Sequence, residues 1–343
     1  VQTKEGDDVS LSAEHVILAT GSKPRELPGF PIDGDLIIGS DQVLELTQLP
    51  AHAAIIGGGA IGCEFASMLT DLGTQVTILE SAERLIPGAD PDIAKSLQRA
   101  FKKRGIRTIT NATLGGQTLL DTGVTVHLSD GTDIDVEKVI VSVGRTALSE
   151  GLGLENTTVE VDSEGCVVVD QYCRATASGV YAVGDLIATP QLAHVGFAEA
   201  MLAVQNIRDE KASSINYERT AWAIYCHPEV AYAGLTETQA HEAGLEIVVS
   251  KHRFVGNARA AIHGENEGMV KVIAERRIDG KAGRILGVHL IGPWVTEQLS
   301  QGYMAINWEL EIDQISKFIQ PHPTFSEVFG EAVLELAGRT LHG

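Results

Sequence analysis

Residues 53–62 read AAIIGGGAIG, a short apolar run that leads directly into a glycine-rich turn. The run has the length and composition of a buried strand, and the residues from Ala60 onward have the pattern of a helix. Gly57, Gly59 and Gly62 stand between the two at the spacing G-x-G-x-x-G. A strand, this turn and a helix form the start of a dinucleotide-binding βαβ unit. The sequence therefore predicts an α/β fold of the Rossmann type.

Each glycine of the turn has its own physical reason. Gly57 permits a tight turn, Gly59 lets a pyrophosphate approach the backbone, and Gly62 lets the helix pack closely on the strand. The first turn of the helix, which contains Ala60 and Ile61, offers unpaired N–H groups and a partial positive charge to the phosphates. These five residues are therefore expected to bind the pyrophosphate of a dinucleotide.

An acidic residue, Glu80, ends the next predicted strand, residues 75–80. Its carboxylate would accept hydrogen bonds from ribose hydroxyls and would repel a 2′-phosphate. The first arginine that follows is Arg84, which is not directly adjacent. The sequence therefore predicts NAD as a cofactor in preference to NADP. The alternative is a glycine-rich turn followed by a surface glutamate.

Composition sets broader limits. The 343 residues are too many for one ordinary core and predict two or three domains. A net charge of −20 argues against binding nucleic acid or an anionic membrane. The four scattered cysteines are in no metal-ligand spacing, so we expect no metal site and a cytoplasmic location. The chain begins with valine rather than methionine, and we expect it to be part of a longer protein.

The predicted elements change in character near residue 216. Before it, strands and helices alternate as in an α/β fold; after it, strands come first and helices follow, as in an α+β domain. The strands are expected over residues 53–56, 75–80, 124–128, 136–143, 166–169, 179–183, 246–250, 269–274 and 285–290. The helices are expected over residues 60–72, 92–104, 193–208, 296–307 and 324–337.

Two further strand ends have glycine where a ligand could approach. Thr20 and Gly21 follow a strand over residues 15–19, and Gly184 and Asp185 follow the strand over residues 179–183. In open α/β sheets, ligands lie beyond the carboxyl ends of the strands. The Asp185 carboxylate could accept a hydrogen bond from a polyol hydroxyl, or it could be an ordinary turn residue.

A helix is predicted to open at Leu192, Ala193 and His194. Its positive end could stabilise an anionic reduced flavin, which would make the second nucleotide FAD. His194 alone is more typical of a capping or core histidine than of a catalyst.

The tail reads PHPTFSE over residues 321–327, so that prolines flank His322 and Glu327 follows five residues later. A fixed imidazole with a carboxylate to orient it is the arrangement that general acid–base catalysis requires. Thr324 and Glu327 also form the pattern of a capping box, in which Glu327 only satisfies the start of a helix. The two interpretations are equally supported by this segment.

These motifs, taken in order, resemble those of the pyridine nucleotide–disulfide oxidoreductases over the whole chain. The resemblance is carried by residues 19–22, 57–64 with Glu80, 143–145, 181–185, 192–194, 227–230 and 322–327. It is closest to those members that oxidise protein-bound dihydrolipoamide to lipoamide and reduce NAD.

The resemblance implies a Rossmann-like FAD domain, present in part, with an inserted NAD-binding Rossmann domain and a C-terminal α+β dimerisation domain. The expected boundaries are residues 1–25 and 149–215 for the FAD domain, 26–148 for the NAD domain and 216–343 for the dimerisation domain. The resemblance adds Glu64 and Gly144 to the NAD site. It assigns Thr20, Gly21, Gly184, Asp185, Leu192, Ala193 and His194 to FAD.

The resemblance also implies a catalytic role for the tail. His322, oriented by Glu327, would be the acid–base that serves the disulfide of the partner subunit in a homodimer. The implied partners are the lipoyl domains of 2-oxoacid dehydrogenase complexes.

The family begins with a glycine-rich FAD fingerprint and a redox-active cysteine pair, and neither is present in this sequence. We therefore expect an N-terminal segment to be missing from the chain. Two alternatives stay open: an inert NAD-binding and dimerising fragment, and a related flavin reductase with another disulfide substrate.

Overall fold

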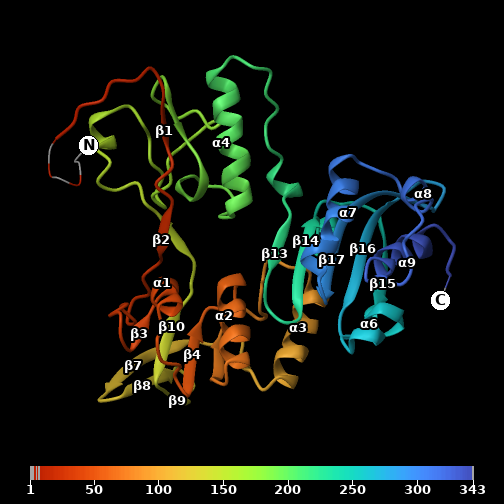
Figure 1. Cartoon of the computed structure of the whole chain (residues 1–343), viewed down its shortest axis with the longest axis horizontal. Coiled ribbons are helices and arrows are strands. Elements are labelled where there is room, and N and C mark those ends of the chain that lie inside the picture. The colour runs from red at the N-terminus through yellow and green to blue at the C-terminus, as the bar shows by residue number, and fades with distance from the viewer. Residues whose placement is uncertain (1–3, 5, 7, 342–343) are drawn as a thin grey trace. The chain divides into compact units, whose positions relative to one another are not determined.

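The computed structural model describes Lys4, Gly6 and residues 8–341 (Figure 1). Judged by their contacts, the described residues divide into two compact units. The first unit contains residues up to Arg25 together with Arg145–Tyr217, and the second contains Glu26–Gly144 and the residues from Glu218 onward. The first unit is therefore discontinuous in sequence. None of the described helices is long and apolar enough to cross a membrane.

The N-terminal part of the second unit is built on a parallel five-stranded sheet with the strand order β3-β10-β4-β5-β6. Its central strand β4 has three fully buried residues, which is typical of a parallel sheet covered on both faces. A three-stranded antiparallel sheet follows β6 in the chain. The bounds are β3 Ile37–Ile38, α1 Ser40–Leu44, β4 His52–Ile56, α2 Ala60–Asp71, β5 Gln75–Leu79, α3 Pro91–Lys103, β6 Arg107–Ile109, β7 Leu114–Leu120, β8 Gly123–Leu128, β9 Asp133–Val136 and β10 Lys138–Val141.

The start of α3 is specified by its sequence. Asp90 is the N-cap, and its side chain accepts a hydrogen bond from the N–H of Asp92. Pro91 occupies the first helical position, where its missing N–H costs nothing, and Lys102 and Lys103 lie in the last turn, where positive charge is favoured. Asp90 is also a charged residue that is fully buried.

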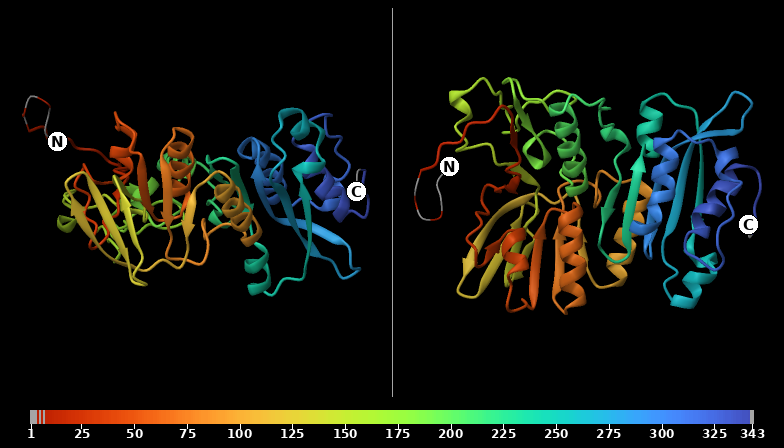
Figure 2. Two further views of the ribbon diagram at one scale, coloured as in Figure 1. Left: turned by 90° about the horizontal axis from the view of Figure 1, so that it is seen from below. Right: turned by 45° about the horizontal axis from the view of Figure 1, so that its top comes forward.

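The C-terminal part of the second unit is built on an antiparallel sheet with the order β13-β14-β17-β16-β15. Helix α7 packs on β14 and β17, and α9 packs on β15 and β16 (Figure 2). The bounds are β13 Trp222–Ile224, β14 Glu229–Gly234, α5 Glu237–Glu242, β15 Ile247–Arg253, α6 Ala258–His263, β16 Met269–Arg276, β17 Ala282–Gly292, α7 Val295–Asn307, α8 Ile312–Ile315 and α9 Glu327–Leu336.

The two parts of the second unit share a hydrophobic core. One cluster of buried side chains contains Ile93 and Phe101 of α3 together with Met269 of β16 and Ile291 of β17. Helix α3 accordingly lies beside β17 (Figure 1).

The described residues of the first unit form two short pairs of strands and one long helix. Strand β1, Val16–Leu18, pairs in parallel with β12, Val180–Ala182, and β2, Ser22–Pro24, pairs antiparallel with β11, Arg145–Ala147. Helix α4, Ala193–Ile207, follows a 3-10 turn at Gly184–Leu186. The parallel pairing brings the carboxyl ends of β1 and β12 to the same edge.

Three predicted elements are wrong in detail. Residues 136–143 are not one strand, because β9 ends at Val136 in the antiparallel sheet and β10 begins at Lys138 in the parallel sheet. Residues 166–169 form only isolated bridges at Val167 and Val169. Helix α9 begins at Glu327 rather than at residue 324.

Candidate functional site

The glycine turn between β4 and α2 leaves no room for side chains at two of its positions. Gly57 has a φ of +105°, and a Cβ there would lie 2.3 Å from the carbonyl oxygen of Ser142 in the neighbouring chain segment. A Cβ on Gly62 would lie 1.9 Å from the carbonyl oxygen of Gly57. Both contacts are with backbone atoms, which cannot rotate away. These two glycines are therefore required by the turn itself.

Gly59 differs from them, because it faces open space. No atom lies within 4 Å of a Cβ built on it, and it is the N-cap of α2, which has no side-chain cap. Ala60 and Ile61 follow as the first residues of the helix. An open helix N-terminus with no side chain in front of it fits the pyrophosphate of a dinucleotide.

A pocket of about 560 Å³ lies over this edge of the parallel sheet. It is lined by Gly57, Gly59, Glu80, Ser142 and Gly144, among others, so the ends of β4, β5 and β10 all contribute. The predicted residues Gly57, Gly59, Glu80 and Gly144 thus lie together. The volume suits a ligand of cofactor size.

Glu80 forms part of the pocket wall and is only 8% exposed. Its Oε2 accepts a hydrogen bond from the N–H of Gly58 at 2.6 Å, and its Oε1 accepts one from the N–H of Ala82 at 2.7 Å. The carboxylate is therefore held in place by two backbone groups. Arg84 is paired with the neighbouring Glu83 and donates to the carbonyl of Pro87, so its charge is engaged within its own loop.

Glu64 lies one turn further along α2. Its Oε1 accepts a hydrogen bond from the N–H of Tyr225 at 2.8 Å. Burial raises the pKa of Glu64, and the Tyr225 hydrogen bond works against that rise. The structure thus places Glu64 against the start of the C-terminal part of the second unit, whereas Glu80 lines the pocket.

All four cysteines are free. Burial raises the pKa of Cys63, Cys166, Cys173 and Cys226, that of Cys173 and of Cys226 to about 12. A thiol with a raised pKa is protonated and unreactive near neutral pH. These four thiols therefore lack the properties of a redox-active pair.

In the first unit, the ends of β1, β2 and β12 meet around Asp185. Oδ2 of Asp185 accepts a hydrogen bond from the Ser22 hydroxyl at 2.6 Å, and the Arg145 Nε donates to the same hydroxyl oxygen at 2.6 Å. Arg145 Nε lies 3.7 Å from Asp185 Oδ2. Thr20 donates from its hydroxyl to the carbonyl of Leu148. The predicted FAD residues Thr20, Gly21, Gly184 and Asp185 follow adjacent strand ends, as expected from the parallel pairing of β1 and β12.

Glu199 organises the same region and was not predicted from the sequence. It is fully buried in α4, and its carboxylate accepts hydrogen bonds from the Gly184 N–H, the Thr189 hydroxyl and the Tyr217 hydroxyl. Its only signal in the sequence is a single acid within the otherwise apolar residues 195–204. Leu192 is the N-cap of α4 and offers no side-chain cap, so Ala193 and His194 form an uncapped first turn. Glu199 thus holds Gly184, which follows β12, against α4, while the positive N-terminal end of α4 is the part that suits an anionic group of FAD.

His322 and Glu327 lie in direct contact. His322 Nδ1 is 2.8 Å from Glu327 Oε1, while Glu327 Oε2 accepts a hydrogen bond from the Thr324 N–H at 2.8 Å. Glu327 thus makes both of the contacts proposed as alternatives, with one oxygen for each. The capping box forms only in part, because the Thr324 hydroxyl donates to the carbonyl of Pro321 instead.

The contact favours one tautomer of the neutral ring. An ionised carboxylate only accepts hydrogen bonds, so the proton of the neutral imidazole belongs on Nδ1, which leaves the lone pair on Nε2. The His322 side chain is 63% exposed, and the ring lines a pocket of about 150 Å³ with His252, Arg253 and Asn257. Asn257 donates to the carbonyl of Thr324 and so supports the His322 segment. The pair is arranged for acid–base chemistry with a second molecule.

A parallel sheet with an open glycine turn defines a class of protein that binds dinucleotides, and an exposed histidine oriented by an acid adds the means to move a proton. Residues 1–200 match the pyridine nucleotide-disulphide oxidoreductase family, and residues 220–333 match the dimerisation domain of that family. The chain belongs to this family.

Curated relatives extend this match over nearly the whole chain. The dihydrolipoyl dehydrogenase of Bacillus subtilis is 39% identical over 337 residues, which are 97% of this chain and 70% of the relative. The mitochondrial dihydrolipoyl dehydrogenase of Pisum sativum is 35% identical over 347 residues, covering 100% of this chain and 68% of the relative. A leghemoglobin reductase of Glycine max is 36% identical, covering 97% of this chain and 64% of the relative.

Solved structures show the same fold. LpdA from Mycobacterium tuberculosis has a TM-score of 0.90 at 27% identity, covering 98% of this chain and 72% of that one. RclA from Escherichia coli, an HOCl-induced flavoprotein disulfide reductase, has a TM-score of 0.86 at 27% identity, covering 93% of this chain and 73% of that one.

These findings confirm the predicted family, the α/β fold class with a C-terminal dimerisation domain, and the oxidoreductase class. The family uses FAD and NAD(H), which confirms the two predicted cofactors. The match to the dimerisation domain supports the predicted homodimer.

Proposed function

We propose that this protein oxidises protein-bound dihydrolipoamide to lipoamide and reduces NAD, the activity for which its dihydrolipoyl dehydrogenase relatives are named. The observation that carries the proposal is the His322–Glu327 pair, in which a carboxylate fixes an exposed imidazole with its Nε2 lone pair available. Oxidation of a dithiol requires the loss of two protons and two electrons, so a positioned base is needed at the first step.

In this proposal His322 Nε2 takes a proton from a thiol of the substrate. Glu327 Oε1 stabilises the imidazolium that results, because it already accepts the Nδ1 proton. The thiolate left behind is the nucleophilic form of the sulfur. In the homodimer, His322 would serve the disulfide of the partner subunit.

The bound flavin and nicotinamide would supply the electron transfer itself. The NAD site consists of the glycine turn (Gly57, Gly59, Ala60, Ile61 and Gly62) with Glu64, Glu80 and Gly144. Glu80, already fixed by two backbone N–H groups, would accept the ribose hydroxyls. Thr20, Gly21, Gly184, Asp185, Leu192, Ala193 and His194 would contact FAD.

The organisation of the protein follows from the same proposal. Residues 1–25 and 149–215 would belong to the FAD domain, 26–148 to the NAD domain and 216–343 to the dimerisation domain. The partners would be the lipoyl domains of 2-oxoacid dehydrogenase complexes, and the location would be cytoplasmic.

A related disulfide reductase is the second candidate, favoured by the structural similarity to RclA. Steady-state kinetics separates the two. The full-length holoenzyme is assayed with dihydrolipoamide and NAD and, in the other direction, with glutathione disulfide and NADH. A kcat/KM at least 100-fold higher for dihydrolipoamide is expected. Preference for glutathione disulfide would overturn the proposal and favour the second candidate.

A further inference from the structure

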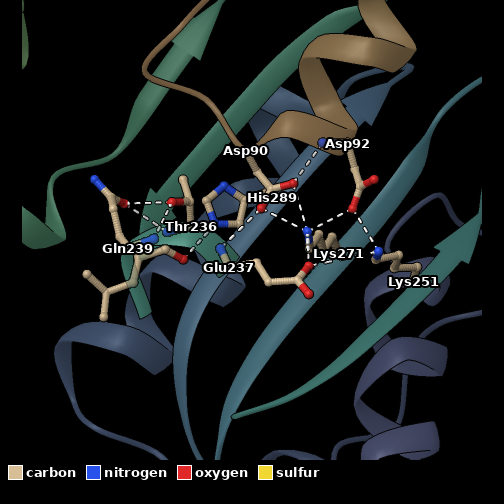
Figure 3. Close-up of polar contacts among 9 residues, drawn as sticks. Asp90, Asp92, Thr236, Glu237, Gln239, Lys251, Lys271 and His289 are labelled. Atoms are coloured by element: carbon tan, nitrogen blue, oxygen red, sulfur yellow. Dashed lines mark hydrogen bonds and ion pairs between the residues drawn. The ribbon is translucent and has the colours of Figure 1, made fainter. Parts of the chain in front are cut away.

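Lys271 lies in β16 with its side chain only 1% exposed, so its ammonium group is buried in the second unit (Figure 3). Its Nζ lies 2.8 Å from both carboxylate oxygens of Asp90 and 2.8 Å from Oδ2 of Asp92. Oε2 of Glu237 lies 2.6 Å away. A buried charge is costly unless it is paired, and Lys271 is paired with three carboxylates. We call Lys271, Asp90, Asp92 and Glu237 the Lys271 clamp.

Asp90 is the central acid of the clamp and is fully buried. Its Oδ1 accepts the N–H of Asp92 at the start of α3, and its Oδ2 accepts the N–H of Glu237 at the start of α5. One carboxylate therefore joins the beginnings of two helices to a strand of the C-terminal sheet. The end of the loop over residues 81–90 is fixed to that sheet by charge.

The same loop packs on the glycine turn. The Ile86 N–H donates to the carbonyl of Gly58 at 2.7 Å. Leu85 is fully buried and packs on Gly58, so that a Cβ built on Gly58 would lie 2.5 Å from Leu85 Cδ2. Pro87 lines the 560 Å³ pocket. A shift of this loop would therefore move the turn that faces the pocket.

We propose that Lys271 is a positioning residue for the dinucleotide site. Through Asp90 it fixes the loop over residues 81–90, and the loop, through Ile86, fixes Gly58 in the turn that would receive the pyrophosphate. The inference rests on the proposed binding of NAD at this turn. It connects the dimerisation part of the chain to the cofactor site.

The two parts of the second unit could be held together without a buried charge. Apolar packing of Ile93 and Phe101 against Met269 and Ile291 already joins the two parts. An exposed ion pair between Lys103 and Glu267 joins them again, from the last turn of α3. Buried ion pairs contribute little net stability compared with apolar packing, but they require a defined geometry. Placing the loop is therefore the role that distinguishes the clamp from these other contacts.

The test compares Lys271→Met with Lys103→Met in the holoenzyme dimer. In Lys271→Met the dissociation constant for NADH, measured by its fluorescence, is expected to rise about tenfold, within the usual range for coupled sites. FAD content and dimer mass are expected to stay unchanged. Hydrogen exchange of the Ile86 amide should accelerate at least tenfold, while that of Ile55 in β4 stays protected. Lys103→Met should alter neither the affinity nor the exchange by more than twofold.

A double variant separates positioning from loss of stability. Lys271→Met with Asp90→Asn removes the unpaired buried charge but keeps an N-cap residue on α3. Its Tm is expected to recover relative to Lys271→Met, while NADH binding stays weak and Ile86 exchange stays fast. Should Lys271→Met fail to fold, the double variant alone carries the comparison.

Two results would overturn the inference: NADH affinity within twofold of the wild type in both variants, or affinity that recovers together with Tm in the double variant. If the wild type itself binds no NADH, the proposed cofactor site is wrong. In that case Ile86 exchange still decides whether the clamp holds the loop, and unchanged exchange would refute it.

Discussion

Oε2 of Glu80 accepts a hydrogen bond from the N–H of Gly58 over 2.6 Å, so the acid at the end of β5 is tied to the middle of the glycine turn. The Glu80 carboxylate, which we expect to favour NAD over NADP, therefore also fixes the shape of the glycine turn. Its second oxygen is held by Ala82, which leaves the group little freedom to turn away from a 2′-phosphate.

We expect NADH to bind more tightly than NADPH, and Glu80→Gln to reduce the difference. The amide removes the negative charge that would accept the ribose hydroxyls, and the loss of this charge-assisted hydrogen bonding costs about 1–3 kcal/mol of NADH binding. Titration of both cofactors by fluorescence measures this. Asp121→Asn, which removes an exposed acid at the turn between β7 and β8, is the control and should change neither affinity by more than twofold. Equal affinity of the wild type for the two cofactors would contradict the prediction.

Gly59→Ala and Gly62→Ala should separate binding from folding. A methyl group at Gly59 meets no protein atom within 4 Å, so Tm is expected to stay within a few degrees while NADH affinity falls at least tenfold. A methyl group at Gly62 would lie 1.9 Å from a backbone oxygen, so Tm itself should fall. Calorimetry and fluorescence titration give the two quantities. Undiminished NADH binding by Gly59→Ala would place the pyrophosphate elsewhere.

His322→Gln in the holoenzyme should lower turnover with dihydrolipoamide by roughly two to four orders of magnitude. FAD content and dimer mass should be unchanged, because the side chain is largely exposed. Glu327→Gln should slow turnover less, since its amide oxygen can still accept the Nδ1 proton. His241→Gln, at an exposed histidine in the last turn of α5, is the control and should keep full turnover. Near-normal turnover of His322→Gln would leave only the helix-end role for Glu327.

Asp92 predicts a pH dependence of stability. Burial acts to raise its pKa, but the hydrogen bonds from Lys251 and Lys271 outweigh burial and hold the pKa at about 2. An unfolded aspartate titrates near pH ~3.9. The folded pKa is the lower one, so the stabilisation is complete above about pH 4 and is lost as the pH falls toward about 2.

The measurement is the difference in Tm between the wild type and Asp92→Asn at several pH values. The difference should be a few degrees at pH ~6 and should shrink below pH ~4. Asp121→Asn, at an exposed turn, controls for the loss of one negative charge. A difference that does not depend on pH would show that Lys251 and Lys271 do not stabilise the ionised carboxylate.

Local signals in the sequence were enough to predict which candidate residues lie together. The glycine spacing, Glu80 and the His322–Glu327 spacing are properties of short segments, and the structure places each set together as its spacing implies. The first and last residues of the strands and helices were harder to predict. The apolar pattern over residues 136–143 runs through the point where the chain leaves one sheet and enters another, and hydrophobicity does not indicate which sheet a residue joins.

Contacts between distant segments could not be predicted. Lys271 is the only charged residue within residues 269–274, and Glu199 is the only charged residue within residues 195–204, so both segments indicate an unusual buried charge. Neither segment indicates which residue pairs with the buried charge. Asp90 and Lys271 meet only because α3 packs beside the C-terminal sheet, and Glu199 meets Gly184 because α4 returns to the end of β12.

The pairing of β1 with β12 has a consequence for synthesis. Val16 pairs with Val180, so β1 leaves the ribosome about 160 residues before its partner exists. The parallel sheet between them, from β3 to β10, is complete in the nascent chain well before then, and its folding would bring the two ends of the first unit close together. Once the segment from β3 to β10 has folded, fewer flexible residues would separate β1 from β12, so the two strands would pair more readily. The segment between them would therefore fold before the strands that flank it.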